Sequence, residues 1–215
     1  MTKPLFREDA YLRETHGVVT RITDEGGIVL DQSIFYPTSG GQPGDSGDLS
    51  WDSGAIEIAT SIKGQGDEIV LVPAEPAALP IVGQKVTQKI TWDRRHRHMR
   101  VHTALHLLSA VIPLPVSGGA ISPEKGRLDF DMSEAPEDND ALEATLNKLI
   151  ACHFAVSDEW ITDAELDANP DLVKTMSVQP PRGSGHIRLV RIGVGENTAD
   201  LQPCGGTHVA NTDEI

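Results

Sequence analysis

The chain has 215 residues, 39% of them hydrophobic, and its formal net charge is −14 at pH 7. This length fits one large domain or two small ones, and the apolar content is sufficient for a buried core. The negative charge excludes nonspecific adhesion to nucleic acid, and an aromatic content of 4% excludes a base-stacking platform of the RRM type. The chain starts without an apolar signal core and has no run of eighteen apolar residues, so we expect a cytoplasmic protein with no membrane contact.

The first part of the chain is predicted to be mostly β-structure. Short runs rich in β-branched residues are separated by Gly, Pro and Asp turns, which is typical of a small barrel or sandwich. These runs are residues 17–23, 27–36, 55–60, 68–74 and 85–92. We therefore predict a β-barrel-like N-terminal domain over residues 1–90.

A glycine-rich stretch, FYPTSGGQPGDSG at residues 35–47, looks like a phosphate-binding loop. Such a loop needs a strand before it and a helix behind it. A strand-like run does precede it, but residues 48–59 show no helical period, and no Gly-Lys-Ser/Thr closes the loop. A nucleotide site is therefore excluded, and ATP and its analogues are not expected as ligands.

Near residue 93 the pattern changes to that of a helix, which Pro113 ends. Its apolar stripe is formed by Val101, Leu105 and Leu108. A second helix is predicted over residues 139–153, with Asp138 or Asn139 as its cap.

Two further strands are predicted at residues 154–162 and 186–193, around a short helix near 163–169. Helices and strands that follow each other without βαβ alternation favour an α+β domain. We assign that domain to residues 91–215.

The first helix carries His102 and His106, four residues apart and therefore on one face, where two imidazoles can share one metal ion. The sequence Cys204-Gly205-Gly206-Thr207-His208 brings a thiolate and an imidazole together, because paired glycines permit a tight turn. One cysteine and three histidines fit tetrahedral Zn²⁺, and a thiolate disfavours Mg²⁺ and Ca²⁺. The predicted zinc ligands are His102, His106, Cys204 and His208.

Three neighbouring residues receive other interpretations. Thr103 stands where a metalloprotease would need a catalytic Glu, so that class is excluded. His98 lies four residues before His102, but it stands among arginines and is interpreted as a phosphate or solvent contact. Cys152, beside an apolar helix end, is interpreted as core filler.

The role of the zinc stays open between two alternatives. Four protein ligands close a purely structural site and leave no position for an activated water. In a catalytic site, zinc would gain a fifth ligand, lose one, or orient the substrate while other groups position the water.

Basic residues concentrate in residues 85–100, which hold six of the 18 lysines and arginines, whereas residues 129–171 are rich in acids. This basic strip is predicted to dock a single polyanion, with a solvated helix start as the alternative. Its candidate phosphate contacts are Arg94, Arg95, Arg97 and Arg100.

Five motifs occur in the order FYPTSGGQPGDSG, RRHRHMRVHTALHLLSAV, KGRLDFD, HIRLVRIG and DLQPCGGTHV. In them the chain resembles the AlaX family of free-standing alanyl-tRNA editing proteins and the editing domain of alanyl-tRNA synthetase. The resemblance implies a barrel-like N-terminal domain and an α+β editing domain shared with threonyl-tRNA synthetase, with Zn²⁺ on the four ligands above. It also implies hydrolysis of the ester that joins a wrong amino acid, serine or glycine, to alanine tRNA.

Under this resemblance, mischarged alanine tRNA is the expected partner, and the arginines of the basic strip are expected to contact its phosphates. The glycine-rich stretch is expected to approach a small substrate beside the metal, with a turn that only joins domains as the alternative. The candidate substrate contacts are Thr38, Gly40, Gly41, Gln42 and Gly44. Thr38 or Gln42 would distinguish serine from alanine by hydrogen bonding to its hydroxyl.

No protein general base is assigned, because the terminal ribose hydroxyl can assist the reaction. Arg127 and Asp129 of KGRLDFD are kept either as site residues or, equally, as a structural pair at a strand end. Two alternatives to an editing enzyme are kept: a non-catalytic, zinc-stabilised RNA-binding module, and a zinc hydrolase of another small ester.

Overall fold

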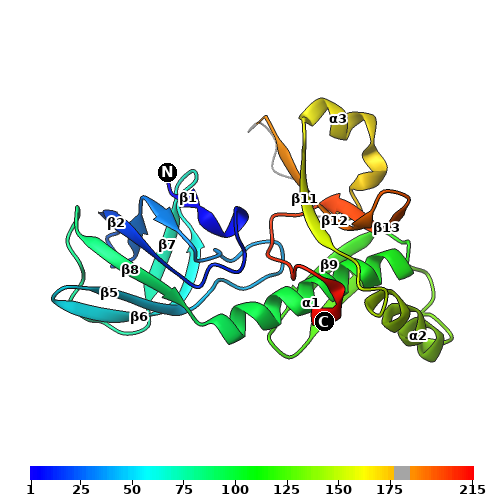
Figure 1. Cartoon of the computed structure of the whole chain (residues 1–215), viewed down its shortest axis with the longest axis horizontal. Coiled ribbons are helices and arrows are strands. Elements are labelled where there is room, and N and C mark those ends of the chain that lie inside the picture. The colour runs from blue at the N-terminus through cyan, green and yellow to red at the C-terminus, as the bar shows by residue number, and fades with distance from the viewer. Residues whose placement is uncertain (177–184) are drawn as a thin grey trace. The chain divides into compact units, whose positions relative to one another are not determined.

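The computed structural model describes residues 1–176 and 185–215, which form two compact units, Met1–His98 and Met99–Ile215 (Figure 1). The sequence placed the division at residue 90, whereas in the structure it falls within helix α1 (Trp92–Val111). The first turns of α1 belong to the N-terminal unit because Arg94 and Arg95 bond to it. In the described part of the chain, no helix combines the length and the apolar character needed to cross a membrane.

The N-terminal unit is a closed barrel of six strands, which confirms the predicted barrel. All neighbouring strands are antiparallel, and inward-facing apolar side chains such as Leu30, Leu49, Ile58 and Leu71 fill the interior. The strand order around the barrel is β2 (Glu14–Ile22), β3 (Ile28–Leu30), β7 (Ile69–Pro73), β6 (Gly54–Lys63), β5 (Gly47–Trp51) and β8 (Lys85–Ile90).

The predicted strand at 27–36 is divided in the structure. After β3, a short strand β4 (Gln32–Ser33) pairs in parallel with β1 (Lys3–Pro4), which leads into a 3₁₀ turn at Leu5–Arg7. The side chain of buried Gln88 then accepts hydrogen bonds from the Ser33 hydroxyl at 3.0 Å and the Ile34 N–H at 3.3 Å. The chain leaves the sheet here because a side chain satisfies backbone groups that a neighbouring strand would otherwise bind.

Arg95 lies in the core of the N-terminal unit, so its predicted role as a phosphate contact is wrong. Its guanidinium is completely buried and forms an ion pair with Asp45, whose two carboxylate oxygens lie 2.9 Å from Nε. Arg95 also donates to the carbonyls of Ile34 and Ala10, at 2.6 and 3.0 Å. Asp45 in turn accepts the Tyr36 N–H, so this pair anchors the end of the glycine-rich stretch to α1.

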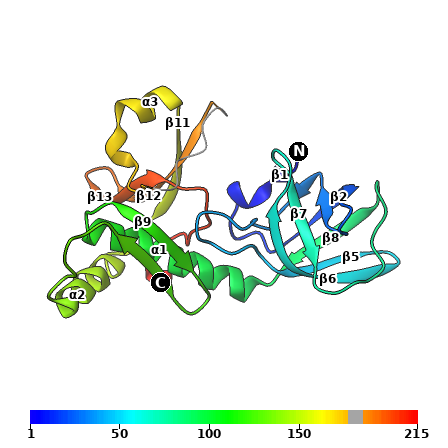
Figure 2. The same ribbon diagram turned by 180° about the vertical axis from the view of Figure 1, so that it is seen from behind.

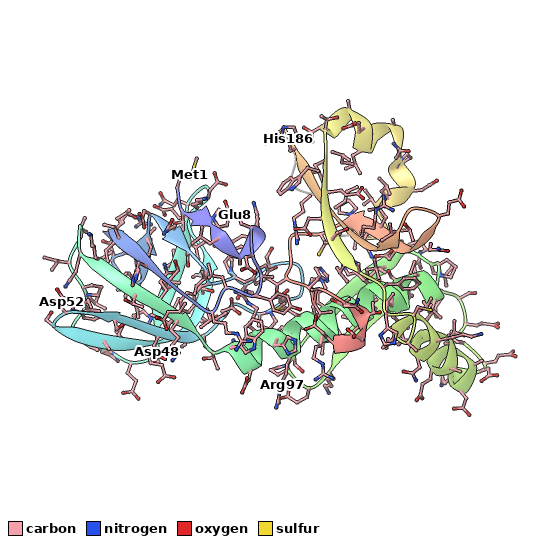
Figure 3. All side chains as sticks on the ribbon, viewed as in Figure 1. Met1, Glu8, Asp48, Asp52, Arg97 and His186 are labelled. Carbon is pink, nitrogen blue, oxygen red and sulfur yellow. The ribbon has the colours of Figure 1, made fainter. Side chains whose placement is uncertain are left out.

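The other arginines of the basic strip differ from Arg95 in exposure. Arg94 is half-buried and donates to the Gly44 carbonyl at 2.7 Å. Arg97 and Arg100 are exposed, and Figure 3 shows Arg97 extending from α1. His98 is completely buried, which corrects its interpretation as a phosphate or solvent contact.

The C-terminal unit is a mixed α+β structure, as predicted. A three-stranded antiparallel sheet has the order β11 (Val156–Ile161), β12 (Ile187–Val194) and β13 (Asn197–Pro203). The remaining elements are the hairpin β9 (Val116–Ile121) and β10 (Gly126–Phe130), helices α2 (Asn139–Ile150) and α3 (Asp163–Ala168), and 3₁₀ turns at Pro170–Leu172 and Thr212–Glu214. Asp138 caps α2 by accepting the Ala141 N–H at 2.8 Å, which confirms that predicted cap.

The sheet has two differently covered faces. On one face, Ile187 and Leu189 form an apolar cluster with Leu166 of α3. The opposite face carries Asp200 and Gln202, whose side chains bond to residues of α1.

The interior face of α1 is polar, because His102, Thr103 and His106 are buried there. The predicted apolar stripe of α1 is only half-buried, and Val101 and Leu105 pack instead over Gly126 of the β9–β10 hairpin. Figure 2 shows strand β9 of this hairpin next to α1. Cys152 is exposed just after α2, so its interpretation as core filler is wrong.

Candidate metal centre

The structure brings the four predicted zinc ligands together in the C-terminal unit. One ligand atom from each of His102, His106, Cys204 and His208 lies within 4.8 Å of the others. The Cys204 Sγ is 3.6 Å from His102 Nε2 and 3.3 Å from His208 Nε2. Three imidazoles and one thiolate at such distances form a donor set that fits tetrahedral Zn²⁺.

Hydrogen bonds fix which imidazole nitrogens face this cluster. The Thr103 hydroxyl donates its single proton to the Met99 carbonyl at 2.9 Å and therefore accepts from His208 Nδ1, 3.1 Å away. The Asp200 carboxylate accepts from His106 Nδ1 at 2.9 Å. With both Nδ1 atoms protonated, the Nε2 lone pairs of His208 and His106 are available to a metal ion.

Asp200 is itself held from both sides. Lys174 contacts its Oδ1 at 2.5 Å, and Gln202 donates to its Oδ2 at 2.8 Å. Gln202 also donates to the Ser109 hydroxyl, which connects the carboxylate back to α1. This network orients the His106 ring, and no local sequence pattern predicts it because α1, Lys174 and β13 are far apart in the chain.

The Cys-Gly-Gly turn is positioned by Arg188 of β12. Its Nη1 donates to the carbonyls of Cys204 and Gly206, both at 2.9 Å. The same guanidinium forms two 2.8 Å hydrogen bonds with Asp158, so it is oriented as a planar fork. Arg188 thereby fixes the backbone on both sides of Gly205, a role that its place in HIRLVRIG does not predict.

The protonation of the cluster suits a metal site. Burial raises the pKa of the Cys204 thiol, but the adjacent imidazoles of His102 and His208 outweigh burial and lower it well below its usual value. Burial and the neighbouring His102 lower the pKa of His208 to about 3. The Cys204 thiol is therefore shifted toward its thiolate form, and His208 is neutral at neutral pH.

His106 shows the opposite shift. Burial lowers its pKa, but the hydrogen bond to Asp200 and the Cys204 thiolate outweigh burial and raise it to about 9. Burial raises the pKa of Asp200, whereas His106 and Lys174 outweigh it and lower it to about 2. Asp200 is thus ionised, and His106 without a metal carries a proton that a metal ion must displace.

This proton predicts the pH dependence of metal binding. Below pH 9, Zn²⁺ binding should release about one proton, and the affinity should rise roughly tenfold per pH unit until it levels off near pH 9. Calorimetric titrations in two buffers of different protonation enthalpy measure the proton count. The substitution Asp200→Asn should weaken the affinity for Zn²⁺ roughly 10- to 100-fold. The affinity of this variant should also stop rising at a lower pH than that of wild type. Binding without proton release would contradict the prediction.

The candidate substrate contacts of the glycine-rich stretch are placed within the N-terminal unit. Gly40 and Gly41 have φ of +55° and +80°, a left-handed backbone that favours glycine. A Cβ on Gly44 would lie 2.0 Å from the Ser61 carbonyl oxygen, so packing against β6 explains this glycine. Gln42 is completely buried, which corrects its prediction as a substrate contact.

Thr38 remains a candidate contact. It is exposed, and its hydroxyl donates to the Ser61 carbonyl at 3.2 Å and accepts the Gly44 N–H at 2.8 Å. These two hydrogen bonds use the proton and one lone pair of the Thr38 hydroxyl, so its second lone pair can still accept a hydrogen bond. In the C-terminal unit, Arg127 and Asp129 form a 3.0 Å surface ion pair on β10, which agrees with the structural alternative for these two residues.

Comparison with known proteins agrees with this fold and site. Residues 11–94 match the family model of tRNA synthetases class II (A), and residues 187–215 match the second additional domain of threonyl and alanyl tRNA synthetases. The barrel and the Cys204–His208 turn, which these matches cover, thus define a protein of the tRNA-synthetase-related class.

Full-length relatives narrow this class to one family. The alanyl-tRNA editing proteins AlaX-M of Methanosarcina acetivorans and Saccharolobus solfataricus are each 35% identical to the chain, which covers 90% of either relative. The alanine–tRNA ligase of Pyrobaculum arsenaticum is 33% identical, but the chain covers only 24% of it. The chain belongs to the AlaX family of alanyl-tRNA editing proteins, which are aminoacyl-tRNA deacylases and therefore hydrolases.

Proposed function

We propose that the chain is a trans-editing hydrolase that deacylates alanine tRNA mischarged with serine or glycine, using Zn²⁺ held by His102, His106, Cys204 and His208. Membership of the AlaX family and the Cys–His donor set support this proposal. A pocket shaped for alanine admits glycine and rejects an added hydroxyl poorly, so a second site that removes such errors is needed.

The exposure of the cluster favours a catalytic metal over a purely structural one. The three histidines are buried, but Cys204 is only half-buried, and the adjoining Gly205 is exposed. A Cβ on Gly205 would meet no heavy atom within 4 Å. This open side of the turn is the observation that carries the proposal, because a substrate needs access to at least one face of the cluster.

Each protein group has a defined task in this mechanism. Zn²⁺, when bound, supplies Lewis-acid chemistry that polarises an ester carbonyl or orients the aminoacyl group. Thr103 and Asp200 hold protons on the Nδ1 atoms of His208 and His106, and Arg188 holds the Cys204 turn in place. We assign no protein general base, and the ribose hydroxyl beside the ester is the proposed source of assistance.

A deacylation assay with seryl-, glycyl- and alanyl-tRNA tests the proposal. Release of serine or glycine without release of alanine is the expected result. Equal binding of all three with no release would indicate a non-catalytic RNA-binding module. Hydrolysis of simple esters without the tRNA, insensitive to salt, would indicate a hydrolase of another small ester.

Thr38 is proposed to recognise the serine hydroxyl. Thr38→Val should reduce the preference for seryl- over alanyl-tRNA by roughly tenfold, the value of one hydrogen bond. Thr38→Ser keeps the hydroxyl and its bond to Gly44, so it is the matched control. An unchanged preference in Thr38→Val would show that the glycine-rich stretch has no selective role.

A further inference from the structure

Among the Phe, Tyr and Trp side chains in the described ranges 1–176 and 185–215, Trp160 is the one that is exposed rather than buried or half-buried, with 52% of its surface accessible. Single exposed apolar residues are ordinary on protein surfaces, so this exposure alone indicates nothing. Its position in the sheet is what distinguishes it.

Trp160 lies in one row with the metal-binding turn. On β11 it is the direct partner of Arg188 on β12, and Arg188 in turn accepts a backbone hydrogen bond from Cys204 at 3.2 Å. Neighbouring strands are spaced by about 4.8 Å, so the backbones of Trp160 and Cys204 are roughly 10 Å apart. A tryptophan, an arginine and a metal ligand therefore stand side by side across three chain segments.

The indole is on the same face of the sheet as the groups that support the metal ligands. Directly paired residues of antiparallel strands share a face, and residues two apart on one strand do so too. Asp158, two residues from Trp160, pairs with Val190, and Val190 pairs with Gln202. Trp160 therefore shares its face of the sheet with Gln202 and Asp200, whose side chains contact α1. Trp160 is exposed on this face, in the row of half-buried Cys204.

The charges near Trp160 favour a neutral ring over a phosphate as its ligand. The two arginines of β12 are already paired, Arg188 with Asp158 and Arg191 with Glu159. Of these pairs, Arg188–Asp158 shares the face of Trp160, whereas Arg191–Glu159 is on the opposite face, so the indole lies beside an arginine whose charge is already neutralised. Stacking on such a face is available to any nucleobase, because every base has a π-face.

We propose that Trp160 is the stacking platform for the base of the terminal nucleotide whose ribose carries the amino acid. This inference rests on the proposed function, because it places the ester at the metal centre. The base of the same nucleotide would then lie on Trp160, in the same row of the sheet as Cys204. Trp160 contacts substrate without taking part in bond cleavage. It sets the position of the ester relative to Cys204 and Arg188.

The test removes the two partners of the stack separately and together. A seryl-minihelix with a terminal adenosine is compared with one whose terminal nucleotide is abasic, each with wild type and Trp160→Ala. On the normal substrate Trp160→Ala should lower kcat/KM roughly 5- to 150-fold, and on the abasic one it should have almost no effect. Equal losses on both substrates would overturn the proposal.

Control variants separate stacking from structural damage. Trp160→Phe keeps an aromatic ring and should recover most of the activity, and metal content should be unchanged in every variant. Val194→Ala removes another exposed apolar side chain from the same sheet and should match wild type. Loss of metal in Trp160→Ala, or no recovery by Phe, would also overturn the proposal.

A binding measurement keeps this inference separate from the proposed function. The stable 3′-amido analogue of seryl-adenosine should quench the tryptophan fluorescence of wild type, and this quenching should be lost in Trp160→Phe. If wild type hydrolyses no mischarged tRNA, the proposed function fails, and this quenching still decides the role of Trp160. Equal quenching in wild type and Trp160→Phe would exclude stacking.

Discussion

Replacing His106 with alanine is expected to remove metal binding and deacylation together. His106 is buried, supplies one of four converging ligand atoms, and is the end point of the Asp200–Lys174 network. Mutating a residue that only hydrogen-bonds to a metal ligand weakens metal affinity by up to roughly 100-fold. Removing the ligand itself should weaken the Zn²⁺ affinity by more than that. Metal analysis of the purified variant and single-turnover deacylation of seryl-tRNA measure both effects.

The matched control is His153→Asn, which changes an exposed histidine of the same unit. His153 has φ of +51°, and asparagine tolerates this left-handed backbone. This variant should keep its metal and its activity. Deacylation that survives in His106→Ala, or in wild type stripped of metal, would restrict Zn²⁺ to a structural role.

Replacing Asp45 with alanine is expected to destabilise the N-terminal unit by about 3–5 kcal/mol, because it leaves the buried Arg95 guanidinium without its carboxylate. The Tyr36 N–H also loses its acceptor. Denaturant unfolding monitored in this unit, by the fluorescence of Trp51 and Trp92 with Trp160→Phe as background, measures the change.

Two further variants sharpen this prediction. The double variant Asp45→Leu/Arg95→Met removes both charges. It should therefore lower the free energy of unfolding by less than Asp45→Ala alone, which leaves one buried charge unpaired. Arg97→Met changes an exposed arginine two residues along α1 and should stay within about 0.5 kcal/mol of wild type. If Asp45→Ala is as stable as Arg97→Met, the Arg95–Asp45 pair does not anchor the glycine-rich stretch.

Local rules predicted much of the fold. The strands of the barrel follow from β-branched runs between turn residues, and α1, α2 and α3 from helical spacing and caps. The strand at 27–36 was predicted too long, because the side chain that interrupts it, Gln88, is more than fifty residues away. Strand β5 was missed because Gly47–Trp51 is short and polar.

The errors in the site all concern whether a side chain is buried or exposed, which residue type and local neighbours do not decide. Arg95 and His98 were assigned to the surface by charge, and Gln42 by polarity, yet all three are completely buried. Cys152 was assigned to the core by its apolar neighbours, yet it is exposed. Residue type gives the average cost of burial, and a partner such as Asp45 removes that cost for an individual side chain.

The sequence by itself determined which four side chains converge in the cluster that could hold a metal ion, because helical spacing pairs His102 with His106 and a glycine turn pairs Cys204 with His208. Its motifs also carried the resemblance to the AlaX family. Only the tertiary structure decided what surrounds those donors: Asp200 and Lys174 behind His106, Arg188 at the turn, and Trp160 in the row beside it. Spacing along a helix or turn is fixed by backbone geometry over a few residues, whereas these neighbours depend on how three strands pair and which face they turn to α1.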